Sequence, residues 1–248
     1  MDIKKIKENL QEAEVIYLDS VDSTNRYAKE NFSGSEGAVI SDEQTKGRGR
    51  LSHRWESKAG KDLTFTIVKE ISMDIRDAFI MNFYTSLIIC RVLKKFGDTQ
   101  LKWPNDILIG GKKVSGILTE TESKNGNIRF YIGIGINVNS TYFADEINDK
   151  ATSLKKVTGS DIDIENLLTD ILKDFFNGIE MVYDVKKVLT EWKKDFNMIN
   201  KEVSFRVNDA QEAHHARVLD VMNDGSILLE MLNGEKLKFY SGEISFIY

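Results

Sequence analysis

Twelve consecutive residues concentrate positive charge among glycines, a combination that suits the binding of phosphate groups. They begin at Gln44, end at Trp55 and have the sequence QTKGRGRLSHRW. Glycine lets backbone N–H groups come close to a ligand, and guanidinium groups such as those of Arg48 and Arg50 match phosphate oxygens. The spacing is not that of a P-loop. Taken alone, the segment predicts a polyanion site, a solvated basic loop or an RNA-binding segment.

The segment around the chain's one proline carries two polar side chains suited to a metal ion or a nucleotide. Its sequence is Lys102-Trp103-Pro104-Asn105-Asp106. The side-chain oxygens of Asn105 and Asp106 could hold a nucleotide or a magnesium ion, which prefers oxygen ligands. The alternative is a corner between two strands, where the same side chains satisfy the turn backbone. On this segment alone, the corner is the stronger interpretation.

Two further segments combine a strand pattern with glycine. In Lys113-Val114-Ser115-Gly116-Ile117-Leu118 the lysine starts a strand. Its charge could neutralise a carboxylate or a phosphate, or it could face solvent at a sheet edge. In Gly133-Ile134-Gly135-Ile136-Asn137 two glycines lie inside a strand, which favours the close approach of a ligand. No third glycine and no helix pattern follow, so a dinucleotide-binding fingerprint is excluded.

The elements that position these segments follow from hydrophobic periodicity and from turn residues. The capping residues Asp22-Ser23-Thr24 introduce a helix, and residues 76–96 form a long amphipathic helix. Residues 45–60 are a loop, and residues 124–127 a hairpin turn. The remaining predictions are helices at 1–10, 25–31, 164–183 and 185–196, and strands at 14–18, 37–44, 62–68, 100–103, 106–109, 113–121 and 128–138.

After about Asn197 the pattern changes to short strands separated by tight turns. We expect strands at 216–222, 226–232 and 235–240, with turns at Asn223-Asp224-Gly225 and Asn233-Gly234. Such a pattern is typical of a small β-barrel or sandwich. The sequence therefore predicts one domain over residues 1–196 and a small C-terminal domain over residues 197–248.

The bulk composition bounds the class of protein. The chain has 248 residues, a 41% hydrophobic share and a net charge of −5, which fits a globular protein and argues against general binding to nucleic acid or anionic membranes. The single cysteine, Cys90, excludes an internal disulfide and is expected to be buried. His214 and His215 lack the companions of a zinc site. No apolar stretch reaches membrane-spanning length and the N-terminus does not resemble a signal peptide, so we expect a cytoplasmic protein.

Five segments in this order resemble the biotin–protein ligase family. They are Ser23-Thr24-Asn25, Gly47-Arg48-Gly49-Arg50 with Trp55, and the segments 102–106, 113–118 and 133–137. The resemblance extends over residues 19–138 and continues more loosely through 151–154 and 242–245. It implies an α/β (α+β) fold with a mixed sheet and flanking helices, related to class II aminoacyl-tRNA synthetases and followed by a small C-terminal β-barrel.

The resemblance also implies an activity. Proteins of this family use ATP and Mg2+ to form biotinyl-5'-adenylate from biotin, and then transfer biotin to a lysine of a biotin carboxyl carrier protein. No tightly bound prosthetic group is expected. The motifs begin near Asp19, so we expect no N-terminal DNA-binding domain, no DNA binding and no repressor function. The resemblance allows a homodimer, formed by extension of the sheet.

Residue by residue, the resemblance predicts three groups of site residues. Asp106 would bind the metal ion or orient the acceptor lysine, and Gly135 would give backbone access. Ser52 and His53 depart from the glycine and arginine usual in the family's loop. The residues that would contact biotin are Ser23, Thr24, Asn25, Gln44, Arg48, Gly49, Arg50, Lys113, Gly116 and Gly133. Those that would contact ATP are Arg50, Trp55, Lys102, Asn105, Lys113 and Asn137. The residues expected to act in catalysis are Arg48, Arg50, Lys113 and Asp106.

Two other classes of function remain as alternatives. A lipoate or octanoyl ligase would share the fold and the adenylation chemistry, but the segments 47–50 and 102–106 are closer to the biotin type. A non-enzymatic protein that binds nucleic acid or an adenylate would use the basic loop. The negative net charge disfavours nucleic acid, and steep weakening of binding with salt would identify it.

Overall fold

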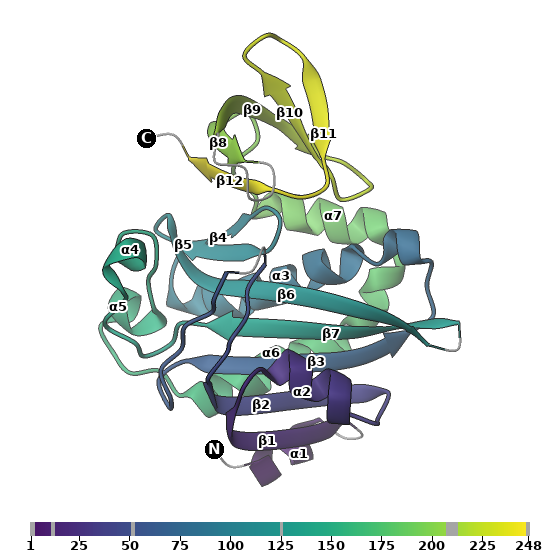
Figure 1. Cartoon of the computed structure of the whole chain (residues 1–248), viewed down its shortest axis with the longest axis vertical. Helices are drawn as coiled ribbons and strands as arrows, with labels where there is room; N and C mark the ends of the chain where they lie inside the picture. The colour runs from purple at the N-terminus through teal and green to yellow at the C-terminus, as the bar shows by residue number, and fades with distance from the viewer. Residues whose placement is uncertain (1–2, 11–12, 51–52, 125, 207–212, 247–248) are drawn as a thin grey trace.

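The computed structural model describes the chain apart from residues 1–2, 11–12, 51–52, 125, 207–212 and 247–248. Its main feature is a seven-stranded sheet (Figure 1). The β1–β2 pair is parallel and the other neighbouring pairs are antiparallel, so the sheet is mixed, as predicted. In spatial order the strands are β1 (Glu14–Val21), β2 (Glu36–Gln44), β3 (Leu63–Ile71), β7 (Asn127–Ile136), β6 (Lys112–Lys124), β5 (Asp106–Ile109) and β4 (Thr99–Lys102).

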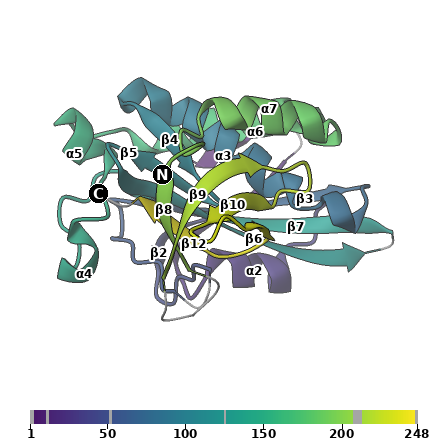
Figure 2. The same cartoon turned by 90° about the horizontal axis from the view of Figure 1, so that it is seen from above.

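Helices cover one face of this sheet, which we call the helix face (Figure 2). Side chains alternate between the two faces of a strand, so Phe65, Ile67, Ile132 and Ile134 enter the core on the helix side. The buried thiol of Cys90 lies in the same core, and burial raises its pKa to about 11. The helices are α1 (Ile3–Asn9), α3 (Ile80–Leu93), α6 (Ile164–Asn177) and α7 (Val185–Lys194), with short 3-10 turns at Ile75–Asp77, Lys94–Phe96 and Ile179–Tyr183.

The prediction that residues 76–96 form an amphipathic helix is wrong in its burial pattern. The helix α3 is buried around almost its whole circumference, with Arg91 its one exposed residue. It lies between the sheet and the helices α6 and α7, so solvent does not reach a polar side. The Thr85 and Ser86 hydroxyls are satisfied within the helix, because Thr85 donates to the Met81 carbonyl at 2.7 Å and Ser86 to the Phe83 carbonyl at 2.9 Å. The Tyr84 hydroxyl donates to the Phe175 carbonyl of α6 at 2.6 Å.

The opposite face, which we call the site face, is covered differently. The helix α2 (Thr24–Asn31) lies over β2, β3 and β7. It closes a small separate core of Ala28, Phe32, Val39, Val68 and Tyr131. The loop of residues 45–61 crosses the rest of this face (Figure 1). Two short helices, α4 (Asp145–Asn148) and α5 (Leu154–Thr158), lie at one end of the sheet.

The C-terminal residues form a second, five-stranded antiparallel sheet. Three strands match the prediction, whereas the first and the last, of five and four residues, were not predicted. The spatial order is β11 (Lys236–Phe239), β10 (Ile227–Met231), β9 (His214–Val221), β8 (Glu202–Arg206) and β12 (Glu243–Phe246). The buried residues of this sheet join the main core.

One hydrogen bond links the second sheet directly to the segment around Pro104. The indole of Trp103, which is buried, donates from Nε1 to the Gly225 carbonyl at 3.1 Å. Gly225 lies in the turn between β9 and β10, and its positive φ and the nearby ring of Phe79 leave no room for a side chain.

In the described part of the chain, no helix is long and apolar enough to cross a membrane.

Candidate active site

The floor of the site face consists of residues with little or no side chain. On β7, the Gly133 position faces α2 and the Gly135 position faces the loop, while Ile132, Ile134 and Ile136 face the core. Gly116 of β6 pairs with Gly135 across the sheet, and Thr66 of β3 pairs with Gly133. Residues two apart on a strand are separated by about 7 Å, so the two glycines of β7 mark neighbouring positions. The result is a shelf of backbone on which side chains of other segments pack, Asn25 at Gly133 and Trp55 at Gly135 and Gly116.

At the Gly133 end of the shelf, the first turn of α2 presents a polar wall. The Gln44 side-chain oxygen accepts hydrogen bonds from the Thr24 backbone at 2.8 Å and from the Thr24 hydroxyl at 3.1 Å. The Thr66 hydroxyl lies 2.9 Å from the Thr24 hydroxyl and 2.6 Å from Asn25 Oδ1. Ser23 is the N-cap of α2, yet its hydroxyl makes no capping bond. Ser23, Thr24 and Gln44 therefore come together, as predicted for a biotin ring site.

Asn25 belongs to this wall but its side chain is fully engaged within the protein. Its amide nitrogen donates to the Leu118 carbonyl at 3.3 Å and to Glu120 at 3.0 Å, while its oxygen accepts from Thr66. A Cβ atom on Gly133 would lie 2.4 Å from this oxygen. Gly133 is thus required so that Asn25 can pack against β7, and Asn25 shapes the wall of the pocket.

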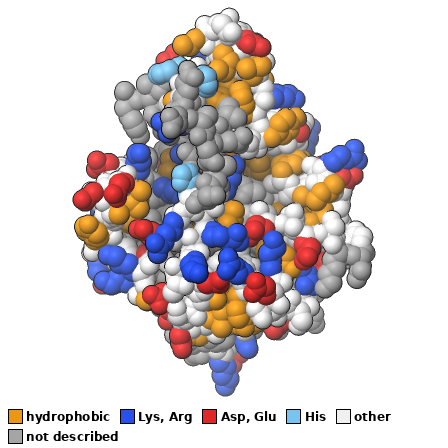
Figure 3. Space-filling model, in the orientation of Figure 1, with side chains coloured by type: hydrophobic (Ala, Val, Ile, Leu, Met, Phe, Trp, Pro, Cys, Tyr) orange, Lys and Arg blue, Asp and Glu red, His pale blue; other side chains and the backbone are white. Residues whose placement is uncertain are grey.

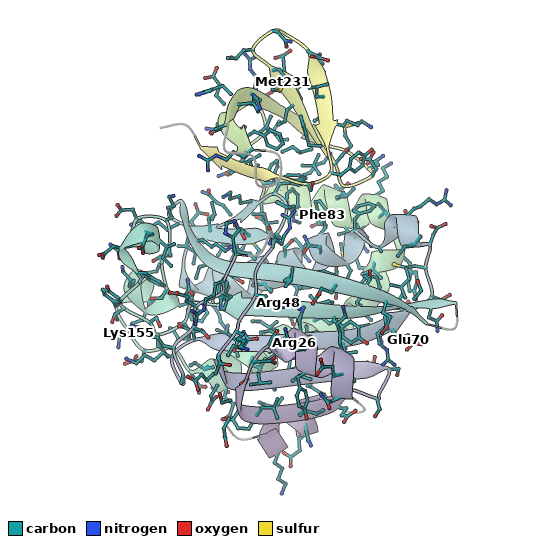
Figure 4. All side chains as sticks on the ribbon, in the orientation of Figure 1. Arg26, Arg48, Glu70, Phe83, Lys155 and Met231 are labelled. Carbon is teal, nitrogen blue, oxygen red and sulfur yellow. The ribbon has the colours of Figure 1, made fainter. Side chains whose placement is uncertain are left out.

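The predicted loop brings two arginines to the shelf. Arg48 donates to the Glu120 carboxylate at 3.0 Å, and Arg50 donates to Asn105 Oδ1 at 3.2 Å. Figure 4 shows Arg48 in front of the sheet, and Figure 3 shows that Lys and Arg side chains gather across the middle of this face. The Gly49 N–H donates to the His53 carbonyl at 2.7 Å, which folds the loop back on itself. Ser52 lies outside the described residues.

Trp55 lies directly on the glycine shelf. A Cβ atom on Gly135 would be 2.2 Å from the indole, and one on Gly116 would be 3.2 Å from it. The Lys113 ammonium lies over the ring, 5.7 Å from its centroid. Among the described residues, Trp55 Nε1 is buried and has no hydrogen-bond partner. A buried N–H without an acceptor is rare, so this atom is suited to meet an acceptor on a ligand.

Lys113 lies at the Gly135 end of the shelf, opposite the polar wall. Its ammonium forms an ion pair with Asp106 at 2.6 Å, and the lysine side chain is 37% exposed. The bulge between β5 and β6 displaces the register between Ile107 and Leu108, and Asp106 pairs with Gly116 on the neighbouring strand. The predicted cation and the predicted carboxylate are therefore brought together, within reach of the same open face.

The segment around Pro104 forms the corner predicted as the alternative, and it also contributes to the site. The Trp103–Pro104 peptide bond is cis, and the Asn105 amide donates to the Ile117 carbonyl at 2.7 Å. That bond fixes the Asn105 oxygen toward Arg50. Lys102 is half-buried and pairs with Asp106 across β4 and β5.

Asn137 follows the end of β7, two residues after Gly135. It is buried, and its amide nitrogen donates to the Thr152 carbonyl at 3.0 Å and to the Lys113 carbonyl at 3.5 Å. These bonds attach the segment before α5 to the start of β6. The geometry gives Asn137 a part in holding the strand that carries Lys113, and its predicted contact with a nucleotide stays a prediction.

Sequence reasoning missed two residues of the site, Thr66 and Glu120. Thr66 is fully buried and connects Thr24 to Asn25. Glu120 accepts from both Asn25 and Arg48. Burial opposes ionisation of this carboxyl, but the Asn25 hydrogen bond and the charges of Arg48 and Lys29 outweigh it and lower the pKa. The alternation Thr64-Phe65-Thr66-Ile67 was a usable signal for Thr66, because it places threonine on the face opposite the core.

The carboxylates of the site do not form a metal cage by themselves. Within the described ranges of the chain, no group of three histidine, cysteine or acidic side chains could hold a metal ion. Magnesium is commonly held by one or two carboxylates together with phosphate oxygens of a nucleotide. Asp106 fits that pattern, since its carboxylate lies beside Lys113 on the open face.

Comparisons with known proteins agree with this arrangement. The family model described as biotin/lipoate A/B protein ligase family matches residues 17–139. The bifunctional ligase/repressor BirA of Bacillus subtilis (strain 168) is 31% identical over 249 residues, covering 96% of this chain and 76% of that protein. The biotin–[acetyl-CoA-carboxylase] ligase of Paracoccus denitrificans is 31% identical over 169 residues, covering 64% of this chain and 70% of that protein.

Solved structures show the same similarity in three dimensions. Biotin protein ligase from Aquifex aeolicus in complex with biotin and ATP aligns with a TM-score of 0.76 and 28% identity, covering 93% of this chain and 97% of that chain. The apo structure of the same protein aligns with a TM-score of 0.77 and 26% identity. The alignment spans both the main sheet and the C-terminal sheet of this chain.

Proposed function

The chain belongs to the biotin/lipoate A/B protein ligase family, and we propose that it is an ATP-dependent biotin–protein ligase. It forms biotinyl-5'-adenylate from biotin and ATP, and transfers biotin to a lysine of a biotin carboxyl carrier protein. The observation that carries this proposal is the glycine shelf, which has the polar wall and Arg48 at its Gly133 end and Lys113 and Arg50 at its Gly135 end.

The shape of biotin fits the two ends of the shelf. Its ureido group needs a few hydrogen-bond partners in an otherwise enclosed pocket, and Ser23, Thr24 and Gln44 offer them at the first turn of α2. The valeryl chain then runs along β7 toward Gly135, where Lys113 and Arg50 meet the carboxylate. ATP takes the open side next to Trp55, whose unpaired N–H supports a contact with the nucleotide.

The first step joins two anions. The biotin carboxylate attacks the α-phosphorus of ATP and pyrophosphate leaves, so the site must offset charge repulsion before the reactants can meet. Arg48, Arg50 and Lys113 supply this charge, and preorganised cations act more strongly in a site from which water is excluded. Magnesium that enters with ATP would add charge stabilisation there, held by Asp106.

Two of these cations form ion pairs with carboxylates of the site. Lys113 pairs with Asp106, and Arg48 pairs with Glu120. The carboxylates hold the cations in defined positions, which lowers the cost of ordering long side chains when the substrates arrive. Asp106 is released from Lys113 when the α-phosphate takes its place, and the carboxylate can then bind metal or orient the acceptor amine.

The second step transfers the acyl group. The acceptor lysine's neutral amine attacks the acyl carbon of the mixed anhydride, the bond to phosphate oxygen breaks, and AMP leaves. Water would destroy this anhydride, so the loop must cover it until the carrier protein arrives. The hydrogen bond from Trp55 N to the Gly47 carbonyl at 3.0 Å and the Gly49–His53 bond give the loop enough structure for this role.

The test mixes the protein with ATP, magnesium, biotin and an unmodified carrier domain. Mass spectrometry should show one added biotinyl group on the carrier, and pyrophosphate should appear only when both ATP and biotin are present. A parallel reaction with lipoate tests the other substrate of the family. Modification by lipoate and not by biotin would refute the proposal. A domain boundary near Asn197, a homodimer and the lack of DNA binding stay predictions.

A further inference from the structure

Glu120 lies on the site face of β6, beyond the segments to which the sequence assigned a role. It pairs with Tyr131 of β7 across the sheet, and its side chain is 23% exposed. The next residue on the same face of the strand is Glu122, which accepts a hydrogen bond from the Tyr131 hydroxyl at 3.1 Å. The two carboxylates are chemically alike and neighbours, so the difference between their contacts is informative.

Three groups from two other segments converge on Glu120. Asn25 Nδ2 and Arg48 Nη2 each donate to Oε2 at 3.0 Å, and the Lys29 ammonium lies 3.6 Å from Oε1. The carboxyl stays ionised at neutral pH, because these contacts outweigh the effect of burial on its pKa. Glu120 therefore connects the helix α2, the strand β6 and the cationic loop.

The Glu120 contact has a rigid side and a movable side. On the rigid side, Asn25 is held by Leu118 and Thr66 within the buried wall. On the movable side, Arg48 belongs to a loop that is attached at its start by the bond from Thr45 N to the Val21 carbonyl at 2.9 Å. An ion pair with one immobile partner loses less conformational freedom than a pair between two free side chains. The pair can therefore hold the loop.

We propose that Glu120 is a positioning residue for the ligase reaction, which holds Arg48 against the sheet and so keeps the loop closed over the adenylate. The inference rests on the proposed function. Glu120 touches neither biotin nor ATP in this arrangement and acts through Arg48. The two cations Arg48 and Lys29 offset its charge, so a carboxylate here does not repel the bound anhydride.

The main experiment compares Glu120→Gln with Glu122→Gln. Each substitution removes one negative charge from the same face of β6, but only the first removes the partner of Arg48. Protein loaded with biotin and ATP is freed of excess substrate and incubated without carrier, and bound adenylate is followed over time. We expect Glu120→Gln to lose adenylate about tenfold faster, equivalent to about 1.4 kcal/mol, and Glu122→Gln to keep it like the unaltered protein. Equal retention by all three proteins would overturn the proposal.

A double-mutant cycle distinguishes positioning from a general structural effect. If Glu120 acts through Arg48, the change Glu120→Gln should have no further effect on adenylate loss in a protein that already carries Arg48→Gln. Additive effects would overturn the proposal. Transfer to the carrier, measured per bound adenylate, should be unaffected by Glu120→Gln, while the KM for biotin rises.

A readout without substrate separates this inference from the proposed function. Hydrogen exchange of the Gly49 and Trp55 amides, which are bonded within the loop, should speed up in ligand-free Glu120→Gln and not in Glu122→Gln. If the unaltered protein makes no adenylate, the proposed function fails while this measurement still tests the contact. If it makes adenylate and loop exchange is the same in all three proteins, only the role of Glu120 fails.

Discussion

Along β7, Ile132, Ile134 and Ile136 point into the core under the helix face, while the Gly133 and Gly135 positions face α2 and the loop on the site face. The helix face is packed with large aliphatic and aromatic side chains, and the site face has backbone, hydroxyls and charged groups. Because a strand alternates its side chains, one sequence can satisfy both faces at once. Substitutions on the two faces should accordingly separate stability from activity, even at adjacent positions.

The largest effect on activity is expected at the cation end of the shelf. Lys113→Gln removes the charge that meets the carboxylate and the α-phosphate. It should lower adenylate formation by about a hundredfold to a thousandfold, measured as pyrophosphate release with biotin and ATP. The free energy of unfolding should change little, because the Lys113 side chain is more than one third exposed. Lys112→Gln, one residue earlier on β6, is the control, and an equal loss there would contradict the assignment.

The sharpest test of the two faces uses neighbouring residues. Ile134→Ala leaves a cavity in the core and should lower the free energy of unfolding by about 2–5 kcal/mol, with normal activity in the protein that stays folded. Gly135→Ala places a methyl group where the indole of Trp55 lies. It should lower adenylate formation by about tenfold or more, equivalent to at least about 1.4 kcal/mol, with a much smaller change in stability.

Thermal unfolding and pyrophosphate release, measured on Ile134→Ala and Gly135→Ala, show whether the two faces of β7 serve stability and activity separately. If Gly135→Ala unfolds the protein as readily as Ile134→Ala, the shelf is part of the core. The site face would then lack the separate role given to it here.

The sequence predicted the positions of most strands and helices of the main sheet, because their periodicities are strong and local. It predicted Lys113 and the loop arginines as site residues through the resemblance to the ligase family, because each segment taken alone also fitted a solvated surface. It missed the full burial of α3, since burial on a second side depends on α6 and α7, which come about eighty residues later. Periodicity along one helix cannot report a partner so far along the chain.

Glu120 escaped prediction for a related reason. A glutamate on a strand is ordinary, and its importance comes from Asn25 and Arg48, which are 95 and 72 residues away in sequence. Asn137 is a different case. The resemblance to the ligase family predicts a nucleotide contact for it, which stays a prediction, and the structure shows its amide nitrogen bonded to the Thr152 carbonyl. The residue type gives the chemistry, but the partner decides whether that chemistry serves the ligand or the fold.

A smaller effect is expected at the polar wall. Thr66→Val keeps the shape of the side chain and removes the hydroxyl that connects Thr24 with Asn25. It should raise the KM for biotin by about tenfold, the equivalent of about 1.4 kcal/mol, while kcat changes less. The loss of a partner for the buried Asn25 oxygen should cost about 1–3 kcal/mol of stability. Thr64→Val on the same face is the control, since its hydroxyl donates to the Ser41 carbonyl and not to the wall.

Substitution of Trp55 should have a still smaller effect on catalysis, and the fluorescence of Trp55 should report ligand binding. Trp103 and Trp192 are almost fully buried, so a change in tryptophan emission on adding biotin and ATP is expected to come from Trp55. Trp55→Phe should abolish that change and raise the KM for ATP several-fold. An emission change that persists in Trp55→Phe would have to come from Trp103 or Trp192, and would contradict the assignment of the signal to Trp55.

The smallest effect on activity is expected in the C-terminal sheet, where a carboxylate serves the fold instead of the site. Burial opposes ionisation of Asp224, but hydrogen bonds from Ser226 and Tyr240 and the charge of Lys238 lower its pKa to about 2. A carboxyl whose pKa is lowered on folding adds stability above its unfolded pKa of about 4 and loses that contribution as the pH falls toward its folded value.

Asp224→Asn should therefore lower the Tm by a similar amount at every pH from 8 down to about 5, and the gap to the unaltered protein should narrow below about pH 4. Pyrophosphate release at moderate temperature should be unchanged, because the Gly225 carbonyl that receives the Trp103 indole belongs to the backbone and survives the substitution. A loss of adenylate formation with an unchanged Tm would mean that this turn takes part in the site. Asp224 would then affect the reaction as Glu120 is expected to, and the difference between a carboxylate that serves the fold and one that serves the site would disappear.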